Sequence, residues 1–189
     1  MKNLIISFIS MFLIVASAAA QTTIKLNNNE SSIKVTGTST LHDWTVEAEE
    51  AEGYASVQAG SESESISGGR LQVVVDAMNS GKNSMDKVLK KALKKDNHPE
   101  IVFEYTETLK MEPIDNRSFS LLSSGDLTIA GETRQVQLEM TGTLRDGNLR
   151  LEGQKSFKMS EFNIEPPSAM FGTIKSGDKI TVHFSVIFQ

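Results

Sequence analysis

Hydrophobic and polar residues alternate with a period of two along most of the chain. The clearest examples run from Trp44 to Ala48, from Ile101 to Leu109 and from Ile180 to Phe188. Such alternation is typical of strands that bury one face. Turn residues separate the runs, and Asp146-Gly147 between two apolar runs predicts a hairpin. The pattern therefore predicts about eight to ten short strands.

One segment departs from this pattern. Between Ser84 and Asn97 the apolar residues recur at helical spacing, and they are Met85, Val88, Leu89, Ala92 and Leu93. Ser84 is a favourable N-cap, and the lysines that follow favour the negative end of the helix dipole. We therefore expect one short helix that covers one end or side of the sheet with its apolar stripe turned inward.

Strands of this number and spacing are typical of a sandwich or a barrel. Closure removes exposed strand edges, and roughly eight strands enclose an interior that is either filled or holds one small ligand. We therefore expect an all-β fold with one short helix, in the form of a closed antiparallel β-barrel of about eight strands. The same alternation fits a filled interior and an open cavity, and the sequence leaves both open.

The N-terminal segment is typical of a signal peptide. Lys2 precedes an apolar run from Leu4 to Val15, and Ala18-Ala19-Ala20 forms a small-residue cleavage site. We expect a signal peptide over residues 1–20 and a single domain over residues 21–189, which would be periplasmic or secreted. No later segment is apolar and long enough to span a bilayer.

Composition narrows the possible partners. The chain has a net charge of −5 and contains no cysteine. Cleavage would also remove Lys2, and the resulting negative charge argues against nucleic acid as a partner. The lack of cysteine excludes disulfides and a lipid-modified cysteine.

Catalytic and metal-ligating groups are sparse. Ser39, His42 and Asp43 have the residue types of a nucleophilic triad, but adjacent strand residues point to opposite faces, so His42 and Asp43 are badly placed to pair. The three histidines, His42, His98 and His183, show no ligand spacing, and His183 is expected to face outward. We predict no catalytic residue, no metal site and no cofactor, and hence a protein that is not an enzyme.

Four motifs follow one another in an order that resembles the YceI-like family. They are the segments Gly37 to Trp44, His98 to Phe103, Gly125 to Val136 and Phe157 to Ile164. The resemblance implies a lipocalin-like antiparallel barrel in the bacterial periplasm, which encloses a polyisoprenoid chain or a similar lipid such as a quinone. A binding or carrier function follows from the resemblance.

The side chains expected to contact such a ligand are the large inward residues of the strands, the helix and one loop. They are Trp44, Leu89, Leu93, Phe103, Leu127, Ile129, Leu138, Met140, Phe157, Phe162, Phe171, Val182 and Phe184. Trp44 also suits a plain core position, and Phe171 either packs under the barrel end or forms part of a lid.

The helix carries a basic face opposite its apolar stripe. Its lysines are Lys87, Lys90, Lys91, Lys94 and Lys95. A solvated face is the simplest interpretation. The alternative hypothesis is a transient contact with an anionic membrane surface, at which the protein would collect or deliver its lipid.

Two further functions remain open at this stage. One is a filled barrel that acts as an interaction or stress-response module without a ligand. The other is an enzyme that acts on a hydrophobic substrate. The sequence also leaves open the head group and chain length of the ligand, the delivery partner and the oligomeric state.

Overall fold

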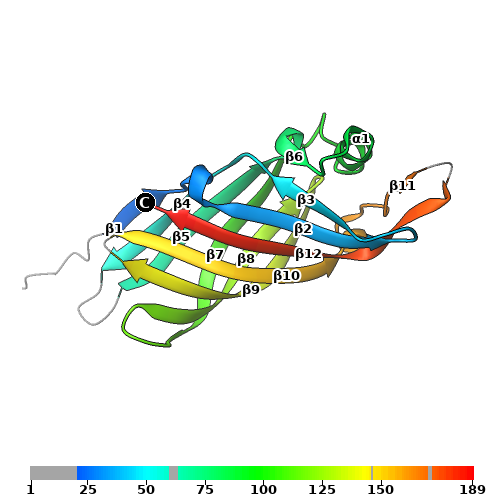
Figure 1. The fold of residues 1–189 in the computed structure, drawn as a ribbon. Helices are drawn as coiled ribbons and strands as arrows, with labels where there is room; N and C mark the ends of the chain where they lie inside the picture. Colours follow the sequence, from blue (N-terminus) through cyan, green and yellow to red (C-terminus); the bar gives the residue numbers. More distant parts are fainter. Residues whose placement is uncertain (1–20, 60–63, 146, 170–171) are drawn as a thin grey trace, which may run out of the picture.

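A computed structural model describes residues 21–59, 64–145, 147–169 and 172–189. Residues 1–20, where the signal peptide is predicted, and Phe171 lie outside the described residues. The chain is mostly β with one α-helix (Figure 1). The elements are β1 (Gln21–Lys25), η1 (Asn28–Glu30), β2 (Ser32–Ser39), β3 (Trp44–Ala48), β4 (Ala51–Ala59), β5 (Glu64–Val74), η2 (Val75–Ala77), β6 (Met78–Asn79), α1 (Asn83–Ala92), β7 (Glu100–Pro113), β8 (Ser118–Ile129), β9 (Glu132–Arg145), β10 (Asn148–Lys158), η3 (Met159–Phe162), β11 (Ser168–Ala169) and β12 (Ile174–Phe188).

The strands form one antiparallel sheet that is strongly curled into a half-barrel (Figure 1). Its strand order is β1-β4-β5-β7-β8-β9-β10-β12-β2-β3-β6, and β11 pairs with β12 off this path. In the described part of the chain the end strands β1 and β6 pair with β4 and β3, and not with each other. The prediction of a closed barrel of about eight strands is therefore wrong.

The strand count differs because three long runs are interrupted. The 3-10 turn η1 separates β1 from β2, residues Glu49 and Glu50 separate β3 from β4, and η2 separates β5 from β6. The two parts of an interrupted run bond to different neighbours, as β1 pairs with β4 whereas β2 pairs with β12 and β3. Alternation along the sequence does not reveal such changes of partner, so it predicts fewer strands.

The described chain ends lie side by side. The backbone N–H of Lys25 donates to Gln189 O at 2.9 Å, and the N–H of Gln189 donates to Lys25 O at 2.8 Å. Leu26 forms a further antiparallel bridge with Phe188. The C-terminus and β1 consequently lie at the end of the sheet away from α1 (Figure 1).

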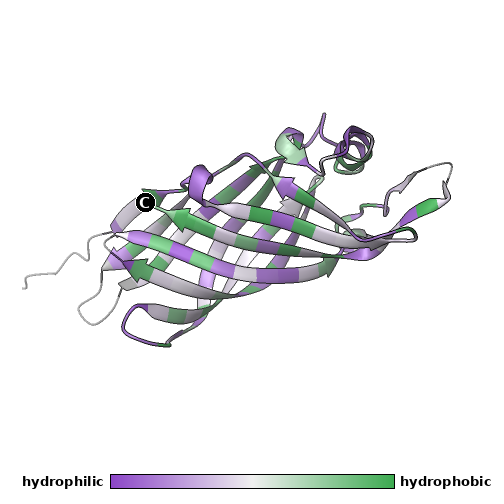
Figure 2. Cartoon of the chain, in the orientation of Figure 1, coloured by the Kyte–Doolittle hydropathy of each residue, from purple (hydrophilic) through white to green (hydrophobic). Residues whose placement is uncertain are grey.

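The strands keep the predicted alternation between their two faces. Bands of hydrophobic and hydrophilic residues follow one another along β10 and β12 (Figure 2). On β12, Val182, Phe184 and Val186 face the concave side, whereas His183 faces outward, where its Nε2 lies 3.2 Å from Thr36 Oγ1. The outward position predicted for His183 matches this geometry.

The helix is shorter than predicted. It ends at Ala92 rather than Asn97, because Lys94 adopts the left-handed conformation with φ of 54°. The N-cap is Lys82 rather than Ser84, and it makes no side-chain capping bond. In the described chain, no helix has the length and apolarity that crossing a bilayer requires.

Candidate functional site: an apolar cavity beneath the helix

The concave face of the sheet lines a cavity of about 760 Å³. Side chains from the sheet and from α1 surround it, and most of them are apolar. The volume lies within the range of roughly 300–1,000 Å³ that is typical of small-molecule sites. Exposed residues such as Leu41, which is 66% exposed and lies in the loop between β2 and β3, mark its rim. The interior is therefore open rather than filled.

Most of the residues predicted to contact ligand lie around this cavity. Those that line it are Trp44, Leu89, Leu93, Phe103, Leu127, Ile129, Leu138, Met140, Phe157, Val182 and Phe184. Contact with a ligand remains a prediction for each of them, but the structure brings them together from six strands, from α1 and, for Leu93, from the turn that follows α1.

Phe162 does not line the cavity, and its assignment to the lining is corrected. It is only 1% exposed and packs edge-on against Phe157, with the ring centroids 5.1 Å apart. Phe162 ends the 3-10 turn η3, where the two-residue period of β10 no longer applies. It supports the wall from behind.

Glycines on neighbouring strands receive the aromatic rings of the wall. A Cβ atom on Gly37 would lie 2.2 Å from the Trp44 ring, and one on Gly125 would lie 2.3 Å from the Phe103 ring. Gly153, which pairs with Phe184 across β10 and β12, would bring a Cβ within 2.9 Å of that ring. Because each ring occupies the space above a glycine, it lies along the wall instead of crossing the cavity.

Trp44 is further fixed by a hydrogen bond. Its Nε1–H donates to Thr38 O at 3.0 Å. The indole therefore has its polar atom satisfied on the sheet while its ring lines the cavity. Since it is the only tryptophan of the chain, its fluorescence reports on this wall.

The helix α1 forms part of the cavity wall. Met85, Val88, Leu89, Ala92 and Leu93 all line the cavity, as the predicted apolar stripe requires. Leu93 is 7% exposed, whereas no residue within α1 itself is buried. The apolar face of α1 thus retains exposure toward the cavity, and an apolar ligand would complete its burial.

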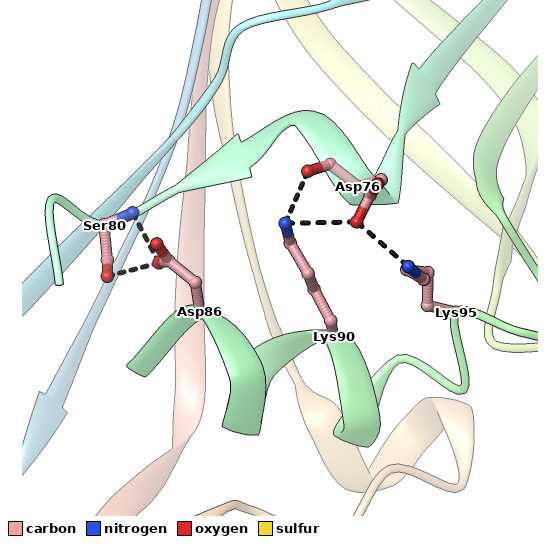
Figure 3. A network of polar contacts seen from close by, with 5 residues as sticks. All are labelled: Asp76, Ser80, Asp86, Lys90 and Lys95. Carbon is pink, nitrogen blue, oxygen red and sulfur yellow. Dashed lines mark hydrogen bonds and ion pairs between the residues drawn. The ribbon is translucent and has the colours of Figure 1, made fainter. Parts of the chain in front are cut away.

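Polar contacts attach both ends of α1 to the adjoining strand (Figure 3). Near its start, Asp86 Oδ1 accepts hydrogen bonds from Ser80 N at 2.8 Å and Ser80 Oγ at 2.5 Å. Farther along, Lys90 Nζ lies 3.2 Å from Asp76 Oδ1, and Lys95 Nζ lies 3.1 Å from the same oxygen. Asp76 belongs to η2, so one carboxylate holds two lysines to the edge of the sheet.

The basic face of the helix is consequently divided. Lys90 and Lys95 bind Asp76, and Lys94 Nζ donates to Ala130 O at 3.4 Å. Lys87 and Lys91 are exposed and make no ion pair or hydrogen bond through their ammonium groups within the described residues. Three of the five predicted surface lysines thus help to attach the helix.

Ser39, His42 and Asp43 form a polar turn at the rim. Ser39 Oγ donates to His42 O at 2.7 Å, and His42 Nδ1 lies 2.9 Å from the main-chain oxygen of Asp43. A triad would instead place the imidazole between the hydroxyl and the carboxylate. Within the described residues, no three His, Asp or Glu side chains gather in a metal-binding group.

The sequence and the fold can now be compared with those of known proteins. The YceI-like domain matches residues 17–188, which is nearly the whole chain. The chain belongs to the YceI-like domain family. Comparison with curated protein sequences gives no match.

Several solved structures share the fold of this YceI-like domain at low sequence identity. BcnA of Burkholderia cenocepacia is 12% identical with a TM-score of 0.65, over 86% of this chain and 98% of BcnA. A polyisoprenoid binding domain of Saccharophagus degradans, implicated in plant cell wall breakdown, is 11% identical with a TM-score of 0.64, over 91% and 99%. The Campylobacter jejuni YCEI protein is 18% identical with a TM-score of 0.52, over 74% and 84%.

Two polar residues of the cavity wall escaped the sequence analysis. Ser123 is completely buried, lines the cavity, and its Oγ makes no hydrogen bond within the described residues. Lys155 also lines the cavity, from β10. Its position could have been found, because Lys155 has the same parity as the apolar residues Leu149, Leu151 and Phe157.

The Asp76 contact predicts how the helix responds to acid. Hydrogen bonds from Lys95 and Lys90 lower the pKa of Asp76 below its ordinary value of 3.8. Since a lowered folded-state pKa stabilises the fold above the ordinary value, this contribution is lost only as the pH falls through the lowered pKa. The helix should therefore stay attached from neutral pH down to weakly acidic pH.

Replacement of Asp76 should release α1 without acid. We expect Asp76→Asn to lower the hydrogen-exchange protection of the α1 amides at neutral pH. The exposed residue Asp96 offers the control Asp96→Asn, which changes the charge equally and should leave protection as in wild type. Equal protection of α1 in wild type and Asp76→Asn would contradict the attachment.

Proposed function

We propose that this YceI-like domain binds a polyisoprenoid or a similar long apolar lipid in its cavity and carries or stores it. The observation that carries the proposal is the open cavity of about 760 Å³ with an almost wholly apolar lining. An isoprenoid chain offers nearly nothing to hydrogen-bond, so apolar burial at roughly 25 cal/mol per Å² supplies its affinity, less the cost of ordering the chain. The Saccharophagus degradans neighbour is itself described as polyisoprenoid binding.

The geometry favours binding over the two other functions. A filled module without a ligand does not fit an open cavity whose aromatic rings lie along the wall above glycines. The enzyme hypothesis needs polar groups that converge on a substrate, whereas Ser39 and His42 bond to backbone oxygens in a turn at the rim. Sequestration needs no such groups.

A blocked cavity tests the proposal. Val182 lies near the middle of β12 and pairs with Val35 on β2, and both residues line the cavity. Val182→Phe should place a ring in the space of the ligand and weaken the binding of geranylgeraniol by about tenfold or more, which corresponds to about 1.4 kcal/mol. Quenching of Trp44 fluorescence on titration with geranylgeraniol measures the affinity.

The outward residue Thr45 on β3 provides the matched control. It is exposed and its strand pairs with β2, so Thr45→Phe adds the same ring outside the cavity. We expect it to bind geranylgeraniol as wild type does. A wild-type protein that fails to bind geranylgeraniol, or a Val182→Phe variant that binds it normally, would refute binding in this cavity.

We also propose that the lipid is exchanged at an anionic membrane surface. The exposed and unpaired Lys87 and Lys91 support this contact, and they lie on the helix that forms the cavity wall. Each lysine near a charged membrane contributes roughly 1 kcal/mol. The other lysines of this face already have partners in the fold.

The double variant Lys87→Glu/Lys91→Glu tests this contact. We expect it to bind vesicles that contain phosphatidylglycerol at least about tenfold more weakly than wild type does, and sedimentation with the vesicles measures this. Lys25→Glu/Lys158→Glu, which changes two exposed lysines of β1 and β10, should keep wild-type binding. If the two double variants bind equally well, α1 does not face the membrane.

Export is the third part of the proposal. Lys2, the apolar run and the alanines before Gln21 support a cleaved signal peptide and a periplasmic or secreted protein. Expression of the full chain in a Gram-negative host should yield an exported protein. Its intact mass should equal that of a chain that begins at Gln21. A cytoplasmic product that retains Met1 would contradict export.

A further inference from the structure

An inward lysine and a buried hydroxyl face the interior of the cavity from nearby strands. On β10 the inward positions are apolar except for Lys155, which pairs with the lining residue Val182. On β8 the inward position Ser123 pairs with Leu138 of β9. All four residues line the cavity, so the order across the wall is Ser123, Leu138, Lys155 and Val182.

The register brings Lys155 close to Leu138. Pairing between β9 and β10 ends at Met140 and Gly153. Leu138 and Lys155 each lie two residues beyond this last pair, on the same face. Paired strands are about 4.8 Å apart, and β9 and β10 are no longer paired at Leu138 and Lys155, so the backbones of Lys155 and Ser123 are at least about 10 Å apart. One compact polar group between them would be within reach of both side chains.

Neither side chain has a partner within the described part of the protein. Lys155 forms no ion pair and no ammonium hydrogen bond there, and the Ser123 Oγ, at 0% exposure of the residue, is unbonded. Two other polar side chains of the lining do have partners, since the Tyr105 hydroxyl donates to Ile66 O at 3.1 Å and Arg70 pairs with Glu104. A buried hydroxyl is costly to leave unpaired, and Lys155, as a half-buried residue, lines the same cavity without an anionic partner among the described residues.

The charge of the lining has one sign. Its charged side chains are Arg70, Lys82 and Lys155, and no Asp or Glu lines the cavity in the described residues. This contrasts with the net charge of −5 of the chain. An anionic group that enters the cavity would meet an ammonium donor and a hydroxyl donor without a repelling carboxylate.

We propose that Lys155 and Ser123 form an anion-binding subsite for the head group of the bound lipid. The ligand class is an amphiphile with a long apolar chain and a terminal carboxylate or phosphate. This inference rests on the proposed function, because the apolar cavity must take up the chain before the head group reaches the subsite. Lys155 supplies the charge, and Ser123 donates a hydrogen bond.

The experiment compares three ligands that share one chain. Geranylgeraniol, geranylgeranoic acid and geranylgeranyl monophosphate are titrated separately into the purified protein, and Trp44 fluorescence reports binding. Wild type should bind at least one of the two anions about tenfold more tightly than the alcohol. The acid and the monophosphate together decide whether the head group is a carboxylate or a phosphate.

Removal of the charge should abolish this preference. In Lys155→Met and Lys155→Gln the ratio of anion to alcohol affinity should fall to about one, while the alcohol binds at least as well as in wild type. Ser123→Ala should lower the ratio by a few fold. Lys179→Met removes an exposed lysine of β12 that does not line the cavity, and it should keep the wild-type ratio.

The possible failures can be told apart. A wild type that binds the alcohol without preferring either anion overturns the subsite and leaves the proposed function intact. The same holds if both Lys155 variants keep the wild-type ratio, since the ammonium then extends to water instead of the cavity. A wild type that binds none of the three ligands overturns the subsite and the proposed function together.

Discussion

The structure depends on a concave apolar face that stays unfilled. An apolar surface normally collapses until its side chains reach the packing density of a crystal. Here the concave face stays open, because its aromatic rings lie against the sheet over glycines and do not extend into the cavity. Trp44, Phe103 and Phe184 each lie over a glycine, and none of the three could lie flat if the glycine carried a Cβ atom. The cavity is therefore a consequence of cross-strand pairs rather than of missing side chains.

The helix α1 completes this arrangement at one side. Its apolar stripe faces the cavity, and its polar contacts tie it to the strand beside it through Asp76 and Asp86. The attachment is polar and exposed, whereas the wall it completes is apolar. The binding of an apolar chain and the attachment of the helix thus rely on different interactions, and each can be altered without the other.

The sequence predicted correctly which side chains face inward, because this depends on the two-residue period of a strand or the helical spacing. It did not predict the features that depend on strand register or on where the chain turns. The two-residue period places Val182 and Phe184 on the inner face, and helical spacing does the same for Leu89 and Leu93. Phe162 was misplaced because η3 changes the period. The strand count and the end of α1 were missed because they depend on pairing partners and on the left-handed Lys94. The contacts between aromatic rings and glycines depend on the register of neighbouring strands. The alternation of polar and apolar residues along one strand carries no information about that register.

The hydrogen bonds between Lys25 and Gln189 have a practical consequence. They fix the last residue of the chain at the end of the sheet that lies away from α1 (Figure 1). A fused protein or a surface linker at the C-terminus would therefore leave the helix and the adjoining rim accessible. The domain can be immobilised through that terminus with α1 turned toward the solution.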